Sequence, residues 1–229
     1  MSHDESHEHH HHDHDHDHPH VHGGADHHPH RPDVDDTLTY CRQLEIAVRE
    51  LLIEKGIFTA EEVRAGIEEM DGRTPENGAR VVARAWADPE FKQELLANPG
   101  RACESLGYVM DTTTQLAVVE NTPQVHNVIV CTLCSCYPRA LLGMPPTWYK
   151  SLAYRRRTVR EPRAVLKEFG LELPDDVTVR VHDSNADLRY LVLPLRPEGT
   201  TDMTEAELAG LVTRDCLVGV AVPRKPAKK

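Results

Sequence analysis

Residues 128–136 read Val-Ile-Val-Cys-Thr-Leu-Cys-Ser-Cys, an apolar triplet followed by three cysteines within six residues. The triplet is β-branched, as buried strands tend to be. The cysteines are therefore expected in a tight loop at the end of a strand. Because a strand fixes the direction of the chain, such a loop can hold its side chains in a defined arrangement. This stretch predicts a domain that contains strands, with a side-chain cluster at the end of one of them.

The cysteine cluster is typical of a metal site. Six cysteines, three of them in one cluster, do not suit a disulfide framework, because such close neighbours cannot readily reach good disulfide geometry. Structural zinc usually takes four ligands from two separated pairs, and here there is one cluster. Cys41, Cys103, Cys216 or His126 would have to supply the fourth ligand. Structural zinc, a redox pair and a specialised metal loop are the alternatives at this point.

The spacing of the last two cysteines has a chemical consequence. Only Ser135 separates Cys134 from Cys136, so two thiolates on one ion would bring the main-chain nitrogens of Ser135 and Cys136 close to it. A strongly Lewis-acidic ion could then deprotonate those amides and gain two more ligands. Three sulfurs and two nitrogens leave one octahedral position open for water or substrate. The sequence permits this arrangement without demonstrating it.

Short apolar runs predict the remaining strands. They are bounded by Pro, Gly, Asn or Asp and cover residues 116–119, 128–130, 177–181, 188–193 and 217–222. Helices are expected between them at residues 162–169, which Gly170 follows, and after Thr204, which forms a capping box with Glu207. This half of the chain is predicted to be an α+β domain of stacked layers.

The preceding segment is predicted to be a helical arm. Apolar residues from Leu44 onward recur every three or four positions until Gly56. Thr59 with Glu62 opens a second helix, and Thr74 followed by Pro75 opens a third, whose buried face would carry Val81, Val82, Ala85 and Trp86. Such arms, with little core of their own, are often wrapped around a partner.

Charge and histidine are concentrated at the N-terminus. Residues 1–36 carry a net charge of −9, and the remaining chain carries −2. Fourteen of the sixteen histidines lie in the first 30 residues, interleaved with Asp. This composition predicts a disordered tail, either a metal buffer or merely solvated. The nearly neutral body disfavours nucleic-acid binding.

Several stretches together resemble nitrile hydratase α subunits. The loop, preceded by Val-His-Asn-Val-Ile-Val and followed by Tyr-Pro, is similar to the metal-binding loop of that family. The similarity extends over residues 142–150, 159–163, 189–197 and 211–220, and in all covers roughly residues 43–223. The resemblance implies an N-terminal helical arm and a layered α/β/β/α domain, that is, an α+β fold.

The resemblance also implies a metal centre and a reaction. The ion would be low-spin Co(III), one per subunit, with Fe(III) as the alternative; Thr132 resembles the cobalt type. Its ligands would be the sulfurs of Cys131, Cys134 and Cys136 and the amides of Ser135 and Cys136. Cys134 would mature to a sulfinic and Cys136 to a sulfenic acid. The implied catalytic residues are Cys136, Cys134 and Ser135, and the implied reaction is the hydration of a nitrile to an amide.

Two positions depart from the nitrile hydratase pattern. Arg139 stands where that family usually has a tryptophan that lines the substrate pocket, and Thr112 stands where some members place a glutamine. The related thiocyanate hydrolase γ subunits have arginine at the first position, and their segment resembles residues 154–157 of this chain. An anionic substrate would suit Arg139. A salt bridge at a subunit interface is its alternative role.

Together, these observations predict how the chain is divided into segments and which partners it has. The chain divides into a tail at 1–38, a helical arm at 39–110, a metal-binding domain at 111–223 and a basic tail at 224–229. Its partners are expected to be β-type subunits, in a heterodimer or larger assembly, and a metallochaperone, with no nucleic acid and no membrane; the expected compartment is the cytoplasm. The alternatives are a thiocyanate hydrolase γ subunit and, more distantly, a non-catalytic zinc- or cobalt-binding protein.

Overall fold

The computed structural model describes residues 39–110 and 113–226, which form two compact units. Met1–Lys55 is the first unit, and its described part is helix α1 (Tyr40–Glu54), in which no residue is buried. Gly56–Lys229 is the second unit. The predicted tail at 1–38 lies outside the described residues, and the predicted boundary at residue 110 stays a prediction. In the described part of the chain, no helix is long and apolar enough to cross a membrane.

The second unit begins with four helices whose starts follow from capping residues. They are α2 (Ala60–Asp71), α3 (Pro75–Ala87), α4 (Pro89–Ala97) and α5 (Pro99–Ser105). Thr59 and Glu62 form the predicted capping box of α2. The other three helices each begin with proline, whose fixed φ suits the first helical turn. The predicted starts of α2 and α3 are therefore confirmed.

Helix α3 packs its apolar face into the main core of the second unit. Val81, Val82 and Ala85 are buried as predicted, and Trp86 is half-buried. The Trp86 indole N–H donates to the Pro194 carbonyl at 2.9 Å. Helix α3 also contacts α10 (Glu205–Ala209) and α11 (Arg214–Val218), and its buried residues Val81, Val82 and Ala85 belong to the main core.

Four strands form two parallel pairs. Strand β1 (Gln115–Glu120) pairs with β4 (Leu188–Leu193), and β2 (Val125–Val130) pairs with β3 (Thr178–Asp183). These are four of the five predicted strands. Parallel partners need long crossovers, and the β2–β3 crossover carries the helices α6 (Arg139–Leu142), α7 (Thr147–Lys150), α8 (Leu152–Arg157) and α9 (Pro162–Glu168).

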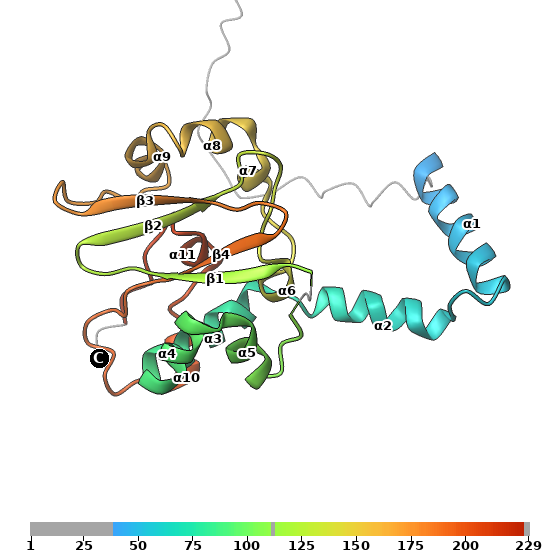
Figure 1. The fold of residues 1–229 in the computed structure, drawn as a ribbon, viewed down its shortest axis with the longest axis horizontal. Helices are drawn as coiled ribbons and strands as arrows, with labels where there is room; N and C mark the ends of the chain where they lie inside the picture. The colour runs from blue at the N-terminus through green and yellow to red at the C-terminus, as the bar shows by residue number, and fades with distance from the viewer. Residues whose placement is uncertain (1–38, 111–112, 227–229) are drawn as a thin grey trace, which may run out of the picture. The chain divides into compact units, whose positions relative to one another are not determined.

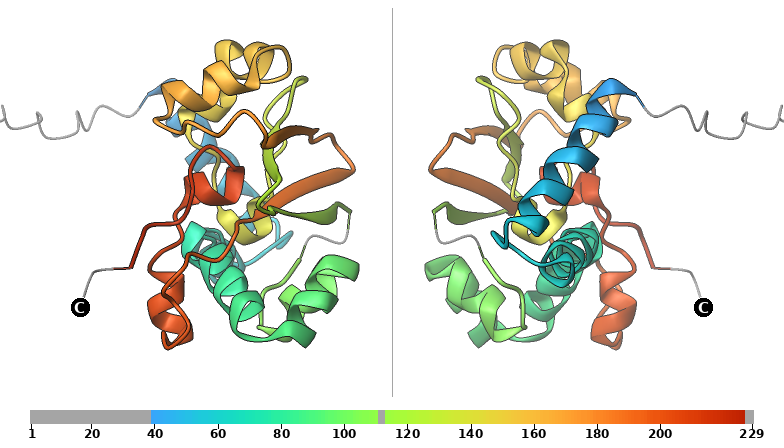
Figure 2. Two further views of the ribbon diagram at one scale, coloured as in Figure 1. Left: turned by 90° about the vertical axis from the view of Figure 1, so that its left-hand side faces the viewer. Right: turned by 90° about the vertical axis from the view of Figure 1, so that its right-hand side faces the viewer.

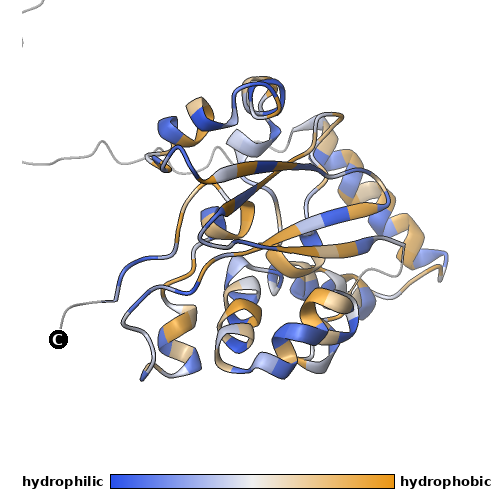
Figure 3. Cartoon of the chain, turned by 60° about the vertical axis from the view of Figure 1, so that its left-hand side comes forward, coloured by the Kyte–Doolittle hydropathy of each residue, from blue (hydrophilic) through white to orange (hydrophobic). Residues whose placement is uncertain are grey.

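The elements of the second unit are stacked in layers (Figures 1 and 2). Helices α4 and α5 pack on β1, strands β2 and β4 contact each other, and α9 packs on β3. The order of layers is thus helices, two pairs of strands, and helices, which confirms the predicted α+β class. Hydrophobic residues lie along the strands between the helical layers (Figure 3). The buried core includes Ile129, Leu191 and Leu193.

The prediction of a fifth strand at residues 217–222 is wrong. Its first two residues belong to helix α11 (Arg214–Val218), which follows α10 (Glu205–Ala209), and the rest is irregular. Leu217, Val218 and Val220 are all fully buried. The last three residues of the helix and the two that follow it are all buried, which gives a continuous apolar run, and periodicity cannot separate such a run from a buried strand. Gly219, with φ of 88°, ends the helix.

Gly219 is predicted to be intolerant of any side chain. A Cβ there would overlap the Asn127 carbonyl oxygen and lie 2.9 Å from the Val128 Cα, on the backbone of β2. Gly170 has a similar φ of +83°, but nothing lies within 4 Å of its added Cβ. Gly170→Ala should cost about 1 kcal/mol from the left-handed backbone alone. Gly219→Ala should cost about 1–3 kcal/mol more from overlap. Denaturant unfolding measures both, and equal losses would contradict the close approach.

His126 is predicted to make stability depend on pH. Its ring is 4% exposed, receives a bond from the Asn121 amide and donates through Nε2 to the Gly219 carbonyl at 2.7 Å. Burial lowers the pKa of His126, an effect that the Gly219 bond partly offsets. The unfolded chain therefore gains a proton first, and the stability due to neutral His126 is lost as the pH falls below about 6.5.

The measurement is the free energy of unfolding from pH 8 to about 5, the range around the ordinary histidine pKa. His126→Gln should flatten the decline relative to wild type. An unchanged slope in this variant would assign the decline to other groups, among them the half-buried His182, whose pKa burial also lowers.

Candidate metal centre

The cysteine loop leaves the central strand β2 directly. Strand β2 ends at Val130, and residues 131–138 form the loop that leads to α6. Cys131 is fully buried, whereas Cys134 is exposed. The Ser184 N–H donates to the Val130 carbonyl at 2.7 Å, which continues the β2–β3 pairing to the base of the loop. The loop therefore starts from a fixed point, and its middle faces outward.

The three predicted ligands lie together. The sulfur of Cys134 lies 3.6 Å from that of Cys131 and 3.2 Å from that of Cys136. All three lie within 4.8 Å of one another, and they are the group suited to a metal ion in the part of the chain that the structure describes. Cys41, Cys103 and Cys216 are free thiols outside this group. Ser135, half-buried, lies between two of the cysteines.

The loop environment separates the acidities of two thiols. Cys134 accepts bonds from the Cys136 thiol and from the Ser135 N–H, which lower its pKa to about 7. Burial, together with the bond that it donates to Cys134, raises the pKa of Cys136 to about 12. Cys134 is therefore the more acidic of the two thiols, and Cys136 retains its proton. An ion bound by both sulfurs must displace that second proton.

Side chains from three other segments hold the loop backbone. The Asp183 carboxylate accepts from the Thr132 N–H at 2.9 Å and from its hydroxyl at 2.6 Å. Tyr149 donates through its hydroxyl to the Cys136 carbonyl at 2.8 Å. Arg155 donates to the carbonyls of Cys131 and Thr132 at 3.1 and 2.8 Å.

Sequence reasoning missed these three residues as parts of the site. Asp183 could have been found only from the β2–β3 pairing, in which it lies opposite Val130. Tyr149 and Arg155 come from α7 and α8, and no spacing in the sequence indicates that these helices return to the loop.

A cavity of about 750 Å³ adjoins the loop. Cys134, Cys136 and Tyr137 form part of its wall, and the arginines 73, 139 and 189 form another part. None of the described residues that line it is acidic. The Arg73 guanidinium pairs with Glu69, whereas the Nη1 atom of Arg189 is buried without a hydrogen-bond partner among the described residues. The cavity is therefore cationic. Arg139 lies in its wall, and Thr112 lies outside the described residues.

Comparison with known proteins identifies the family. Residues 39–221 match the model of the nitrile hydratase alpha chain. This chain belongs to the nitrile hydratase alpha-chain family, and two relatives that are 50% identical to it over the aligned residues are enzyme subunits.

Two of these relatives represent different enzymes. The chain is 50% identical over 183 residues to the alpha subunit of the low-molecular-weight cobalt-containing nitrile hydratase of Rhodococcus rhodochrous, over 80% of this chain and 88% of that one. It is also 50% identical over 192 residues to the gamma subunit of the thiocyanate hydrolase of Thiobacillus thioparus, over 79% of each chain. Identity therefore does not distinguish the two enzymes.

Solved structures of both enzymes share the fold. An iron-type nitrile hydratase double mutant from Comamonas testosteroni Ni1 matches with a TM-score of 0.73 and 47% identity, over 81% of this chain and 91% of that one. An arginine-to-tryptophan mutant of thiocyanate hydrolase matches with a TM-score of 0.75 and 46% identity, over 83% and 95%. At these identities the likeness extends from fold to family.

Proposed function

We propose that this chain is the metal-binding subunit of a cobalt nitrile hydratase, which hydrates a nitrile to an amide. The observation that carries the proposal is the convergence of the Cys131, Cys134 and Cys136 sulfurs in one loop on a cavity wall. The 50% identity to a cobalt-containing nitrile hydratase alpha subunit supports it.

The donor set fits the proposed metal. Three sulfurs within 4.8 Å of one another lie close enough to bind a single ion, and thiolates suit cobalt, iron and zinc. The proposed ligands are these sulfurs and the main-chain nitrogens of Ser135 and Cys136. Thr132 and the cobalt-containing relatives favour Co(III), one per chain, with Fe(III) as the alternative. A zinc-binding protein without catalysis is the more distant alternative, for which a fourth ligand would be needed.

The proposed reaction adds one water to the C≡N bond: R–C≡N and H₂O give R–C(=O)–NH₂. When bound, the ion would supply Lewis acidity toward the nitrile or a water molecule. From the chain itself, the Cys136 side chain, matured to a sulfenic acid, would supply an oxygen as nucleophile or as base toward water. Ser135 would hydrogen-bond to the oxidised sulfurs of Cys134, as a sulfinic acid, and Cys136.

The proposed partners are β-type subunits that complete the site, and a metallochaperone that loads the ion. Exposure of the loop supports the first: Leu133 is 78% exposed, and Cys134 is exposed as well. Helix α1 supports it too, because Tyr40, Leu44, Val48 and Leu51 are exposed at helical spacing. We propose a heterodimer or larger assembly in the cytoplasm.

The cationic cavity favours a second candidate, a thiocyanate hydrolase gamma subunit. Arg139, Arg189 and Arg73 would attract an anion, and Glu69 offsets only the last of them. Thiocyanate also contains a C≡N bond, so the same metal loop would serve it. The gamma subunit of Thiobacillus thioparus, 50% identical to this chain, supports this candidate.

A two-substrate assay separates the candidates. In the complex co-purified with its partner subunits, kcat/KM for a small neutral nitrile should exceed that for thiocyanate. Arg139→Trp removes one cation from the cavity, so it should lower kcat/KM for thiocyanate at least about tenfold, roughly one lost close charge pair. The same substitution should change kcat/KM for the nitrile by no more than about threefold, which is less than half of the free-energy change expected for thiocyanate.

Arg156→Trp is the matched control, because Arg156 is exposed and does not line the cavity. It should change neither value. Turnover of thiocyanate without turnover of nitriles would replace the first candidate by the second. A cobalt-loaded complex inactive on both substrates would reject both.

A further inference from the structure

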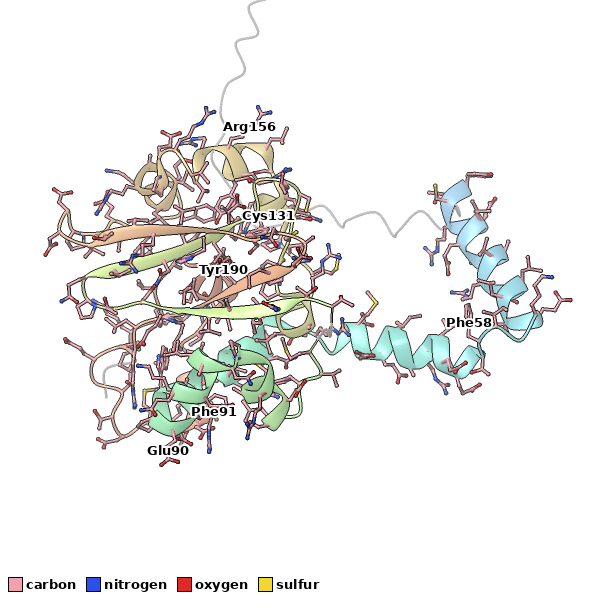
Figure 4. All side chains as sticks on the ribbon, viewed as in Figure 1. Phe58, Glu90, Phe91, Cys131, Arg156 and Tyr190 are labelled. Carbon is pink, nitrogen blue, oxygen red and sulfur yellow. The ribbon has the colours of Figure 1, made fainter. Side chains whose placement is uncertain are left out.

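Helix α8 carries three consecutive arginines with different surroundings, Arg155, Arg156 and Arg157. Arg157 pairs with the carboxylates of Glu161 and Glu168 at 2.5 and 2.6 Å. Arg156 is exposed and lies on the outer side of α8 (Figure 4). Arg155 is half-buried, and its two hydrogen bonds go to main-chain carbonyls of the cysteine loop rather than to a carboxylate.

The two carbonyls belong to the first turn of the loop. Arg155 Nε donates to the Cys131 carbonyl at 3.1 Å, and Nη2 donates to the Thr132 carbonyl at 2.8 Å. One planar guanidinium therefore fixes two successive peptide groups. Asp183 holds the same turn through the N–H and hydroxyl groups of Thr132. The peptide group between Cys131 and Thr132 is therefore held at its carbonyl by a cation and at its N–H by an anion, so it has little freedom to rotate.

That turn determines how the sulfurs meet. The Cys134 N–H donates to the Cys131 sulfur at 3.2 Å, so residues 131–134 close a small ring of contacts. If the peptides after Cys131 and Thr132 rotated, the buried first sulfur would no longer face the other two. The Arg155 charge also lies beside a loop whose thiols must become anions to bind a metal.

We propose that Arg155 is a positioning residue that presets the cysteine loop for metal binding and for the oxidation of Cys134 and Cys136 by dioxygen. One dioxygen molecule would add both of its atoms to the Cys134 thiolate to give the sulfinate, and another would be divided between the Cys136 thiolates of two chains to give the sulfenates. This rests on the proposed function, because it assumes that the loop binds cobalt. Arg155 is not proposed to contact the substrate or the ion. It acts through the carbonyls of Cys131 and Thr132, as the outer partners of metal ligands do in other proteins.

The test compares Arg155→Gln, Arg155→Lys and Arg156→Gln in the complex purified with its partner subunits and with cobalt. Cobalt retained per chain is measured against increasing chelator. Arg155→Gln should lower the apparent cobalt affinity roughly 10- to 100-fold. The cobalt affinity of Arg155→Lys should lie between those of wild type and Arg155→Gln, because one ammonium cannot bond both carbonyls as the guanidinium fork does. Arg156→Gln should match wild type.

Two further readouts separate positioning from a general loss of stability. The thiolate-to-cobalt absorption band, compared at equal cobalt content, should shift in Arg155→Gln and not in Arg156→Gln. In Arg155→Gln, the loop peptide should lack the added oxygens, which in wild type increase the mass of Cys134 by about 32 Da and that of Cys136 by about 16 Da. The thermal midpoint of each variant reports folding. If Arg155→Gln does not fold, Arg155→Lys decides.

Wild-type cobalt affinity, absorption and oxidation in a folded Arg155→Gln, or in Arg155→Lys where the former fails to fold, would overturn the proposal. Wild-type protein that binds no cobalt would instead reject the proposed function, and the inference with it. Cobalt in wild type and in Arg156→Gln, with the loss confined to changes at Arg155, is the expected result.

Discussion

The three cysteine sulfurs are kept within 4.8 Å of one another, and the rest of the site depends on this constraint. If the Cys131 and Cys134 sulfurs, 3.6 Å apart, both became thiolates to bind a metal, their charges would repel by about 5 kcal/mol at an effective dielectric constant of about 20. A free loop would spread to relieve that repulsion. The raised pKa of Cys136 keeps a proton on that sulfur and so limits the repulsion, and a bound cation would offset it further.

The fold resists this spreading from several directions. Strand β2 lies in the middle of the layered domain, and its parallel partner β3 brings Asp183 beside the loop. The β2–β3 crossover then returns two helices to the same place, so Tyr149 bonds the last cysteine of the loop and Arg155 the first. Gly219, packed on the backbone of β2, ties helix α11 to the strand from which the loop leaves. Long-range structure thus supports a six-residue binding element.

Local sequence signals predicted much of this fold, and pairing between distant segments was beyond them. The capping boxes at Thr59 and Thr204 and the prolines that begin helices act within four residues, so helix starts were readable. The three sulfur ligands share one loop, so their convergence was readable too. Arg155 and Asp183 lie 24 and 51 residues from the groups that they bond, and only the folded topology brings them there. Residues 216–220 gave a strand-like pattern because all of them are buried, at the end of α11 and just after it.

The proposed function requires that this loop bind one trivalent ion with its own sulfurs and main-chain nitrogens. X-ray absorption spectroscopy at the metal edge, with elemental analysis of the same complex, tests it most directly. The expected result is about one cobalt per chain, bound by sulfur and lighter nitrogen or oxygen neighbours, and loss of that cobalt in Cys134→Ser. Zinc bound tetrahedrally in the wild type, or cobalt with an unchanged spectrum in Cys134→Ser, would contradict it.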